Sequence, residues 1–172
     1  MTTVNTINDV DLETVGTLVS AIQTDASHAH TVWKAEAVWD RAFRVEATSR
    51  DFAPVVYDEP PALGGTDTGP NPAEQILGAF GSCLAIGYAA NASAEGISIN
   101  RLRVEVEGDL DLHAFLGLGG GHAGFSAVRA TVHLDSDADP EVVARLHEKV
   151  VATSPIGHTI NRPVTVSVDL AG

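Results

Sequence analysis

The chain of 172 residues has little cysteine and little positive charge. Its single cysteine, Cys83, cannot form a disulfide within one chain, and 10 basic residues face 23 acidic ones for a formal net charge of −13. Disulfides are typical of secreted domains, and clustered positive charge attracts nucleic acid. We therefore expect a cytoplasmic protein that does not bind nucleic acid.

Long apolar runs are also missing. No stretch approaches about 20 consecutive apolar residues, so we expect no membrane span and no membrane partner. The first 25 residues carry acidic side chains and no apolar run, so we expect no signal peptide. Hydrophobic residues still make up 44% of the chain, as in globular proteins. At this length the default expectation is a single domain over residues 1–172.

Hydrophobic periodicity predicts an α+β fold with antiparallel sheets. Residues 8–25 have apolar side chains at helical spacing, with Asn8 or Asp9 as the cap. Alternating segments follow one another through short turns, which favours antiparallel pairing. The predicted strands are 30–40 and 42–50, with turn residues Asp40 and Arg41 between them, then 54–59, 99–113, 125–135 and 164–170. Further helices are predicted over 72–95 and 140–153, with a turn region over 153–163.

A proline- and glycine-rich loop over 59–70 precedes the second predicted helix. At about a dozen residues it is long for a connection, and such loops often serve function. Asn71 is a suitable cap for the helix, and Pro72 suits its first position. Glu74 then falls where a glutamate completes a capping box.

The predicted helix over 72–95 is apolar or small nearly all round, which is typical of a helix in an interior. Gly78, Ser82, Ala85 and Ala89 form a stripe of small residues along it. Because glycine costs about 1 kcal/mol relative to alanine in a helix, we expect close packing to offset the cost. The packing partner is either the later helix or the same helix of another subunit.

Cys83 lies well inside this helix and has two interpretations. A free cysteine among apolar neighbours is usually an inert core residue. A reactive thiol needs a cation or a base that stabilises the thiolate. Composition alone favours the core residue.

Two motifs resemble the OsmC/Ohr family of thiol-dependent hydroperoxide reductases. The first runs from DEPPALGG through NPAEQILGAFGSCLAIGYAANA to VEVEG, over 58–108, and the second is LHEKVVATSPIGHTINRPVTVSVDL, over 146–170. The likeness spans roughly residues 30–170, is closest to the OsmC-like branch, and leaves 1–27 as an N-terminal helical extension. It implies an α+β homodimer whose subunits interlock around central helices, with active sites at the subunit interface.

The resemblance also assigns roles to residues. Cys83 stands where the family has its peroxidatic cysteine. The family's resolving cysteine precedes a proline, where this chain has Ser154, so the resolving thiol is missing and turnover needs an external thiol. For the arginine that polarises the thiol, the candidates are Arg41, Arg44 and Arg50. Arg50 is the first choice, and a solvated arginine at a strand end is the alternative.

The catalytic glutamate and a histidine complete the candidate site. The family's glutamate directly follows the Asn-Pro pair, where this chain has Ala73, and the available carboxylate is Glu74. At about 100° per residue, Glu74 lies about 180° around the helix from Cys83, so a cap or a role in the partner's site suits it better. His158, four residues after Ser154, is a further candidate to approach the thiol.

Two classes of function follow from these residues. The first is a one-cysteine organic hydroperoxide reductase in oxidative-stress defence, dependent on an external thiol. The second is a non-catalytic OsmC-like dimer that binds a small apolar ligand or acts as a redox sensor. We expect no cofactor and no metal, because the histidines lack the spacing of a metal site. The GGGHAG stretch over 119–124 lies between two strands and is predicted to be a hairpin turn.

Overall fold

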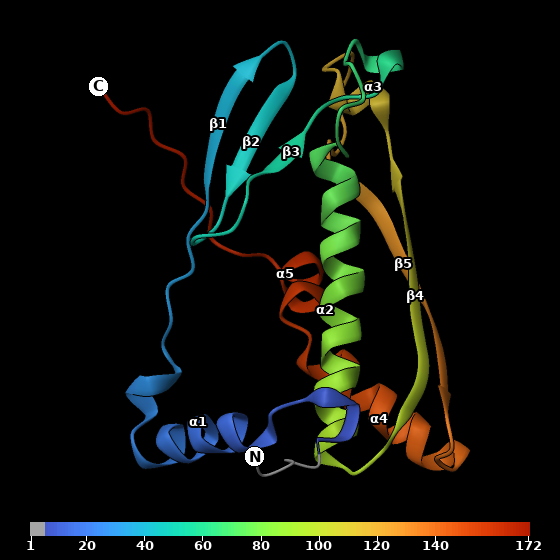
Figure 1. Cartoon of the computed structure of the whole chain (residues 1–172). Coiled ribbons are helices and arrows are strands. Elements are labelled where there is room, and N and C mark those ends of the chain that lie inside the picture. Colours follow the sequence, from blue (N-terminus) through green and yellow to red (C-terminus); the bar gives the residue numbers. More distant parts are fainter. Residues whose placement is uncertain (1–5) are drawn as a thin grey trace. The chain divides into compact units, whose positions relative to one another are not determined.

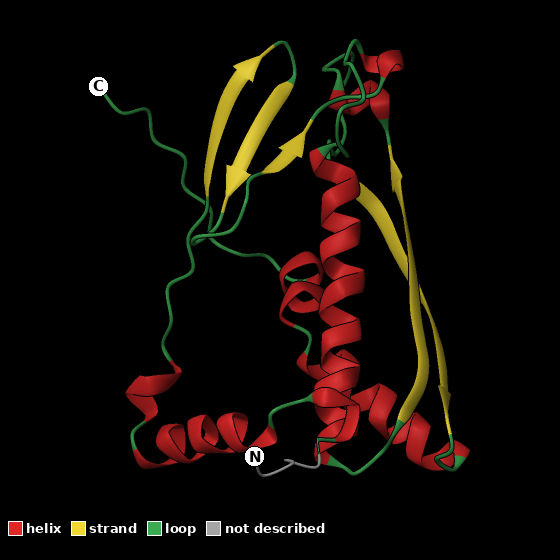
Figure 2. Ribbon diagram, in the orientation of Figure 1, coloured by secondary structure: helices red, strands yellow, loops and turns green. Residues whose placement is uncertain are grey.

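The computed structural model describes residues 6–172, and its contacts divide the chain into two compact units. The first unit is Asp11–Gly78, and the second joins the described residues before Asp11 to Ala79–Gly172. Both contain helices and antiparallel strands, so the predicted α+β class is confirmed (Figures 1 and 2). The expectation of one domain over 1–172, with an extension over 1–27, stays a prediction, and residues 1–5 lie outside the described residues.

The first unit contains a helix, a small sheet and the long loop. Its helix is α1 (Leu12–Thr24), followed by the short 3₁₀ turn η2 (Ala26–Ala29). The sheet is antiparallel in the order β1-β2-β3, with β1 (Glu36–Arg41), β2 (Arg44–Thr48) and β3 (Val55–Tyr57). The three predicted strands are thus confirmed in shorter form.

The turn between β1 and β2 falls later than predicted. We expected Asp40 and Arg41 in the turn, but both belong to β1. The chain reverses at Ala42, which has a φ of +46°, and the indole nitrogen of Trp39 donates to the Ala42 carbonyl oxygen at 2.9 Å. This hydrogen bond gives the carbonyl group of the turn a partner and stabilises the turn at Ala42. The hydrophobic pattern of the sequence does not predict such a bond.

The cap of α1 also differs from the prediction of Asn8 or Asp9. The carboxylate of Asp11 accepts the backbone N–H of Thr14 at 3.0 Å, which is the N-cap bond of α1. The helix therefore begins at Leu12, later than the predicted start.

Asn8 is unavailable as a helix cap because its amide is bonded within the second unit. Its Nδ2 donates to the hydroxyl of Ser93 at 3.0 Å and to the carbonyl of Ile97 at 2.9 Å. Its Oδ1 accepts the backbone N–H of Ile99 at 2.8 Å. One side chain thus joins the N-terminal segment to the end of α2 and the start of β4.

A buried carboxylate, that of Asp58, organises the proline- and glycine-rich loop. Its oxygens accept the backbone N–H of Glu59 and both the N–H and the hydroxyl of Thr66 and Thr68, at 2.6 to 3.2 Å. The Thr66 hydroxyl and the other donors hold the pKa of Asp58 well below its ordinary value. At Gly65 an added Cβ would lie 1.8 Å from the Glu59 carbonyl oxygen, so glycine is required for this compact loop.

The second unit is assembled around α2, most of which belongs to it. A long antiparallel hairpin runs beside α2, and two helices follow the hairpin in the chain (Figure 1). The elements are α2 (Pro72–Ala94), β4 (Ile99–Leu110), α3 (Leu112–Phe115), β5 (Phe125–Ser136), α4 (Pro140–Thr153) and α5 (Pro155–Asn161). The predicted strand over 99–113 was too long at its end, because Asp111 caps the short α3.

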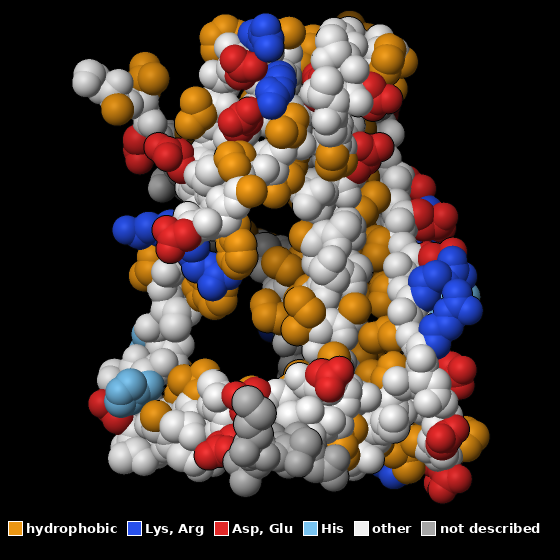
Figure 3. Space-filling view, viewed as in Figure 1, with side chains coloured by type: hydrophobic (Ala, Val, Ile, Leu, Met, Phe, Trp, Pro, Cys, Tyr) orange, Lys and Arg blue, Asp and Glu red, His pale blue; other side chains and the backbone are white. Residues whose placement is uncertain are grey.

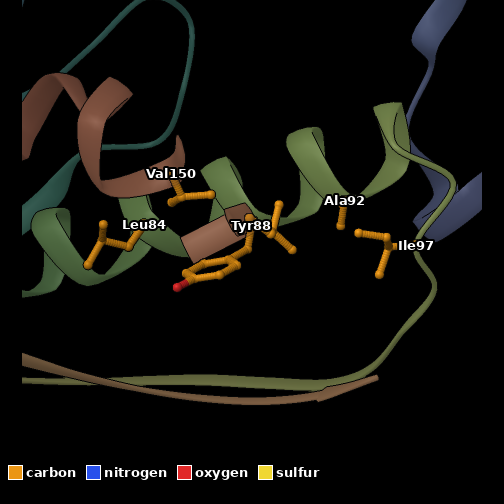
Figure 4. Packing of buried hydrophobic residues seen from close by; sticks show 6 residues of the cluster. Leu84, Tyr88, Ala92, Ile97 and Val150 are labelled. Carbon is orange, nitrogen blue, oxygen red and sulfur yellow. The ribbon is translucent and has the colours of Figure 1, made fainter. Parts of the chain in front are cut away.

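The core of this unit lies between α2 and α4. Figure 4 shows Leu84, Tyr88 and Ala92 of α2 gathered with Ile97 and with Val150 of α4. Leu146 is also fully buried there. By length and composition, α2 is the one helix of the described chain able to cross a membrane, and one face of it is buried in this core.

Two glycines of α2 that lie outside the stripe of small residues allow a close approach to other elements. A Cβ added at Gly87 would lie 3.0 Å from Cγ1 of Val150 on α4. At Gly81 it would lie 3.2 Å from Cγ2 of Val106 on β4. Of the two partners expected for α2, the later helix is therefore found beside it, and a second copy of the helix stays a prediction. At Gly78, in contrast, nothing lies within 4 Å.

The outer face of the hairpin is polar and internally paired. Arg129 bridges to Glu107 and Asp109 at 2.7 and 2.6 Å, and Glu105 contacts His133 at 2.6 Å. Figure 3 shows charged side chains gathered along this hairpin. The alternating pattern of β4 therefore places one face toward the core and the other toward solvent.

Two predictions at the C-terminus were wrong. The region 153–163 was expected to be a turn but contains α5, because Ser154 followed by proline is a helix start. Residues 164–170 were expected to form a strand but have no strand pairing in the structure. Their alternating apolar side chains stay exposed, from 57% to 100%: Val164, Val166, Val168 and Leu170. A strand needs a neighbour that completes its backbone hydrogen bonds, and the chain as described does not place one beside this segment.

Candidate functional site

Cys83 lies near the middle of α2, at the edge of the core. The next residue, Leu84, is buried, while Ile86 is 70% exposed, and Cys83 itself is partly buried. Cys83 as a residue is thus neither fully buried in the core nor fully exposed. A partly accessible thiol is the setting in which cysteine chemistry occurs.

Within residues 6–172, one side chain is hydrogen-bonded to the sulfur, that of Ser154. The Ser154 hydroxyl oxygen lies 3.3 Å from Sγ of Cys83. Ser154 is only 4% exposed, ends α4 and caps α5, where its hydroxyl accepts the backbone N–H of Gly157 at 3.1 Å. Packing of α4 against α2 therefore brings together the two residues at which the resemblance places the peroxidatic and resolving thiols.

Gly157 lies against both the Ser154 hydroxyl and the Phe80 ring, and neither Gly157 nor Phe80 was predicted as part of the site. A Cβ added at Gly157 would lie 3.0 Å from the Ser154 hydroxyl oxygen and 3.2 Å from Cε2 of Phe80. Glycine at this position lets the backbone N–H approach the hydroxyl. The sequence does contain a signal for this helix start. Serine followed by proline is typical of an N-cap and the first helical position, which here places Gly157 in the first turn of α5.

The ring of His158 is bonded away from the thiol. Its Nε2 lies 2.9 Å from the carbonyl oxygen of Ala152, near the end of α4. Because a carbonyl only accepts, Nε2 carries the proton in this bond. His158 is close to Ser154 along α5, but the described hydrogen bonds of its ring do not include Cys83.

Glu74 forms the capping box that its position in the sequence predicted. Its carboxylate accepts the backbone N–H of Asn71 at 2.9 Å, and its own N–H donates to the Asn71 side chain at 2.8 Å. The two hydrogen bonds give partners to backbone N–H groups at the start of α2 that would otherwise have none. A role as polarising carboxylate stays a prediction.

The candidate arginines all belong to the first unit. Arg50 has a φ of +54° and its guanidinium carbon lies 4.6 Å from the centre of the Phe52 ring, a cation–π contact. Arg44 pairs with Glu46 at 2.7 Å, and the side chain of Arg41 is 80% exposed. Which of the three serves a thiolate stays a prediction.

The comparison with protein families bears directly on this site. The model described as OsmC-like protein matches residues 65–169, which include both Cys83 and Ser154. The chain belongs to the OsmC-like family. No curated protein matches it.

Solved structures share the OsmC-like fold at low sequence identity. An OsmC-like protein from Mycoplasma pneumoniae matches with a TM-score of 0.65 and 19% identity, over 76% of this chain and 88% of that one. An organic hydroperoxide resistance protein OsmC from Legionella pneumophila matches with a TM-score of 0.57 and 20% identity, over 76% and 89%. An organic hydroperoxide resistance protein from Elizabethkingia anophelis matches with a TM-score of 0.56 and 16% identity, over 75% of this chain and 87% of that one. At these identities the likeness supports the fold.

Proposed function

We propose that this OsmC-like protein is a one-cysteine, thiol-dependent organic hydroperoxide reductase that serves oxidative-stress defence in the cytoplasm. The observation that carries the proposal is the Ser154 hydroxyl 3.3 Å from the sulfur of Cys83, a partly buried residue on the central helix of an OsmC-like fold. The names of two structural neighbours, both organic hydroperoxide resistance proteins, support the same class of substrate.

The first half-reaction is a displacement at peroxide oxygen. The thiolate of Cys83 attacks the terminal oxygen of the hydroperoxide, so an S–O bond forms while the O–O bond breaks. The departing alkoxide takes up a proton and leaves as the alcohol. The sulfur is oxidised by two electrons to a sulfenic acid, and the peroxide is reduced by the same two.

The second half-reaction requires thiols from outside the chain. Since Ser154 stands in the resolving position, its hydroxyl cannot form a disulfide with the sulfenic acid. An external thiol condenses with the sulfenic acid, releasing water and leaving a mixed disulfide on Cys83. A second external thiol then displaces Cys83 and departs as the oxidised disulfide.

We also propose that the working form is a homodimer. The exposed side chain of Ile86, one turn beyond Cys83, and the exposed apolar residues over 164–170 support this, because surfaces of this kind usually mark association sites. Light scattering of the eluting protein is expected to give twice the mass of one chain. A single-chain mass at micromolar concentration would contradict the homodimer.

Peroxide consumption tests the reductase proposal. Purified protein is mixed with cumene hydroperoxide and dithiothreitol, and the remaining peroxide is followed in wild type and in Cys83→Ser. We expect catalytic consumption by the wild type and background loss with the variant. Equal rates in the two proteins would reject the reductase. Binding of an apolar fluorescent probe by both would then favour the second candidate, a non-catalytic ligand-binding dimer, which the serine at position 154 supports.

A further inference from the structure

We infer that the Ser154 hydroxyl donates a hydrogen bond to the ionised sulfur of Cys83 and thereby favours the thiolate. The inference rests on the proposed function, for which the thiolate is the reacting species. It gives the residue at the resolving position an active role in the chemistry of the sulfur.

The direction of the hydrogen bond follows from which of the two groups carries a hydrogen. A thiolate carries no proton, so at a separation of 3.3 Å the shared hydrogen must come from the Ser154 hydroxyl. That hydroxyl already accepts the N–H of Gly157 at 3.1 Å. Accepting and donating use different parts of the hydroxyl, so capping α5 leaves its single hydrogen free for the sulfur.

The surroundings strengthen the donor. At 4% exposure, Ser154 is shielded from water that would compete for its hydrogen. The Gly157 N–H behind the oxygen polarises the O–H bond, as in any chain of hydrogen bonds. Among the hydrogen bonds of the described residues, the sulfur is the single acceptor facing this hydroxyl.

The preceding residue provides a matched contrast. The hydroxyl of Thr153 donates to the Lys149 carbonyl at 2.8 Å, one turn back along α4. Threonine and serine in adjacent positions thus use their hydroxyls differently, one on its own helix and the other across to α2. Removing each hydroxyl in turn separates a donor to sulfur from a general effect on the end of α4.

The test is the pH profile of alkylation by iodoacetamide, measured without peroxide. Because Cys83 is the only cysteine, the reaction reports one sulfur. A hydrogen bond to a charged group is strong enough that Ser154→Ala should raise the midpoint of the profile by about one pH unit. At neutral pH this lowers the alkylation rate about tenfold, while the plateau rate at high pH, which reports access, does not fall.

Two further variants make the result decisive. Thr153→Ala is expected to keep the wild-type midpoint. Ser154→Gly, which keeps a residue suited to a helix cap, should shift the midpoint as Ser154→Ala does and serves if the alanine variant does not fold. A wild-type midpoint in both Ser154 variants, or an equal shift in Thr153→Ala, would overturn the inference. Since cumene hydroperoxide consumption is compared in wild type and Cys83→Ser, the reductase proposal can fail or stand independently of this profile.

Discussion

Ser154 follows Cys83 by 71 positions, yet its hydroxyl oxygen lies 3.3 Å from the sulfur. The contact joins the middle of α2 to the residue that lies between α4 and α5 and caps both helices. Any side chain of similar length at position 154 is thus within reach of the reacting atom.

The substitution Ser154→Cys should supply the resolving thiol that the chain lacks. Sulfur extends slightly farther from Cβ than oxygen does, and a disulfide needs the two sulfurs about 2 Å apart, so a small side-chain adjustment suffices. One equivalent of hydroperoxide is expected to consume both thiols and to form an internal disulfide. Thiol titration and peptide mapping without reductant measure this. Two thiols that stay titratable after oxidation, or disulfides only between chains, would contradict the geometry.

Two glycines of α2 should respond to alanine in opposite directions. Gly87→Ala places a methyl group 3.0 Å from the fully buried Val150, and an overpacking cost of about 1–3 kcal/mol should outweigh the gain in helix propensity, so the free energy of unfolding is expected to fall. The methyl group of Gly78→Ala has no neighbour within 4 Å, so the better helix propensity of alanine should raise the free energy of unfolding by about 0.5–1 kcal/mol. Urea unfolding of the pair measures both values. Destabilisation by Gly78→Ala would reveal that another surface approaches α2 there.

Glu74 should act through its hydrogen bond rather than through its charge. Glutamine also completes a capping box, so Glu74→Gln is expected to leave both stability and peroxide consumption near wild type. Glu74→Ala loses the bond to the Asn71 N–H and should cost about 0.5–1 kcal/mol in urea unfolding. If Glu74→Gln abolished peroxide consumption without changing stability, the carboxylate would instead belong to the chemistry.

Asp58 should make the protein sensitive to acid. Its pKa is lowered in the folded chain, so its contribution to stability is complete above the unfolded value of about 3.9 and is lost as the pH falls toward the folded value. Asp58→Asn is expected to melt several degrees lower at pH 7 and to lose less stability between pH 5 and acid conditions, on the order of pH 2. The exposed Asp51→Asn is the control. Parallel acid profiles for wild type and Asp58→Asn would exclude this role.

Local patterns were enough to predict the principal elements. The helix over 72–95, its capping box, the long hairpin and α4 were all visible because periodicity and caps depend on neighbours in sequence. The segment over 164–170 shows the limit of such patterns. Its alternation is that of a strand, but pairing depends on what else lies beside it.

The candidate site was predictable in identity but not in geometry. The resemblance to the family pointed to Cys83 and Ser154, whereas their contact arises from packing of α4 on α2 and has no local signature. The geometry of Glu74, in contrast, was predicted correctly, because its capping box joins residues only three positions apart. His158 and Arg50 illustrate the intermediate case, since their partners, Ala152 and Phe52, are close in sequence but were not anticipated.

The amide of Asn8 has a practical consequence for shortened versions of the protein. Trimming the chain to the family-matched region would strip hydrogen-bond partners from the Ile97 carbonyl and the Ile99 N–H, beside the core. Unpaired groups of this kind cost about 1–3 kcal/mol each when water cannot replace the partner. The segment before α1 therefore stabilises the end of α2 and the start of β4. A shortened protein whose boundaries follow the family match alone would lack this segment.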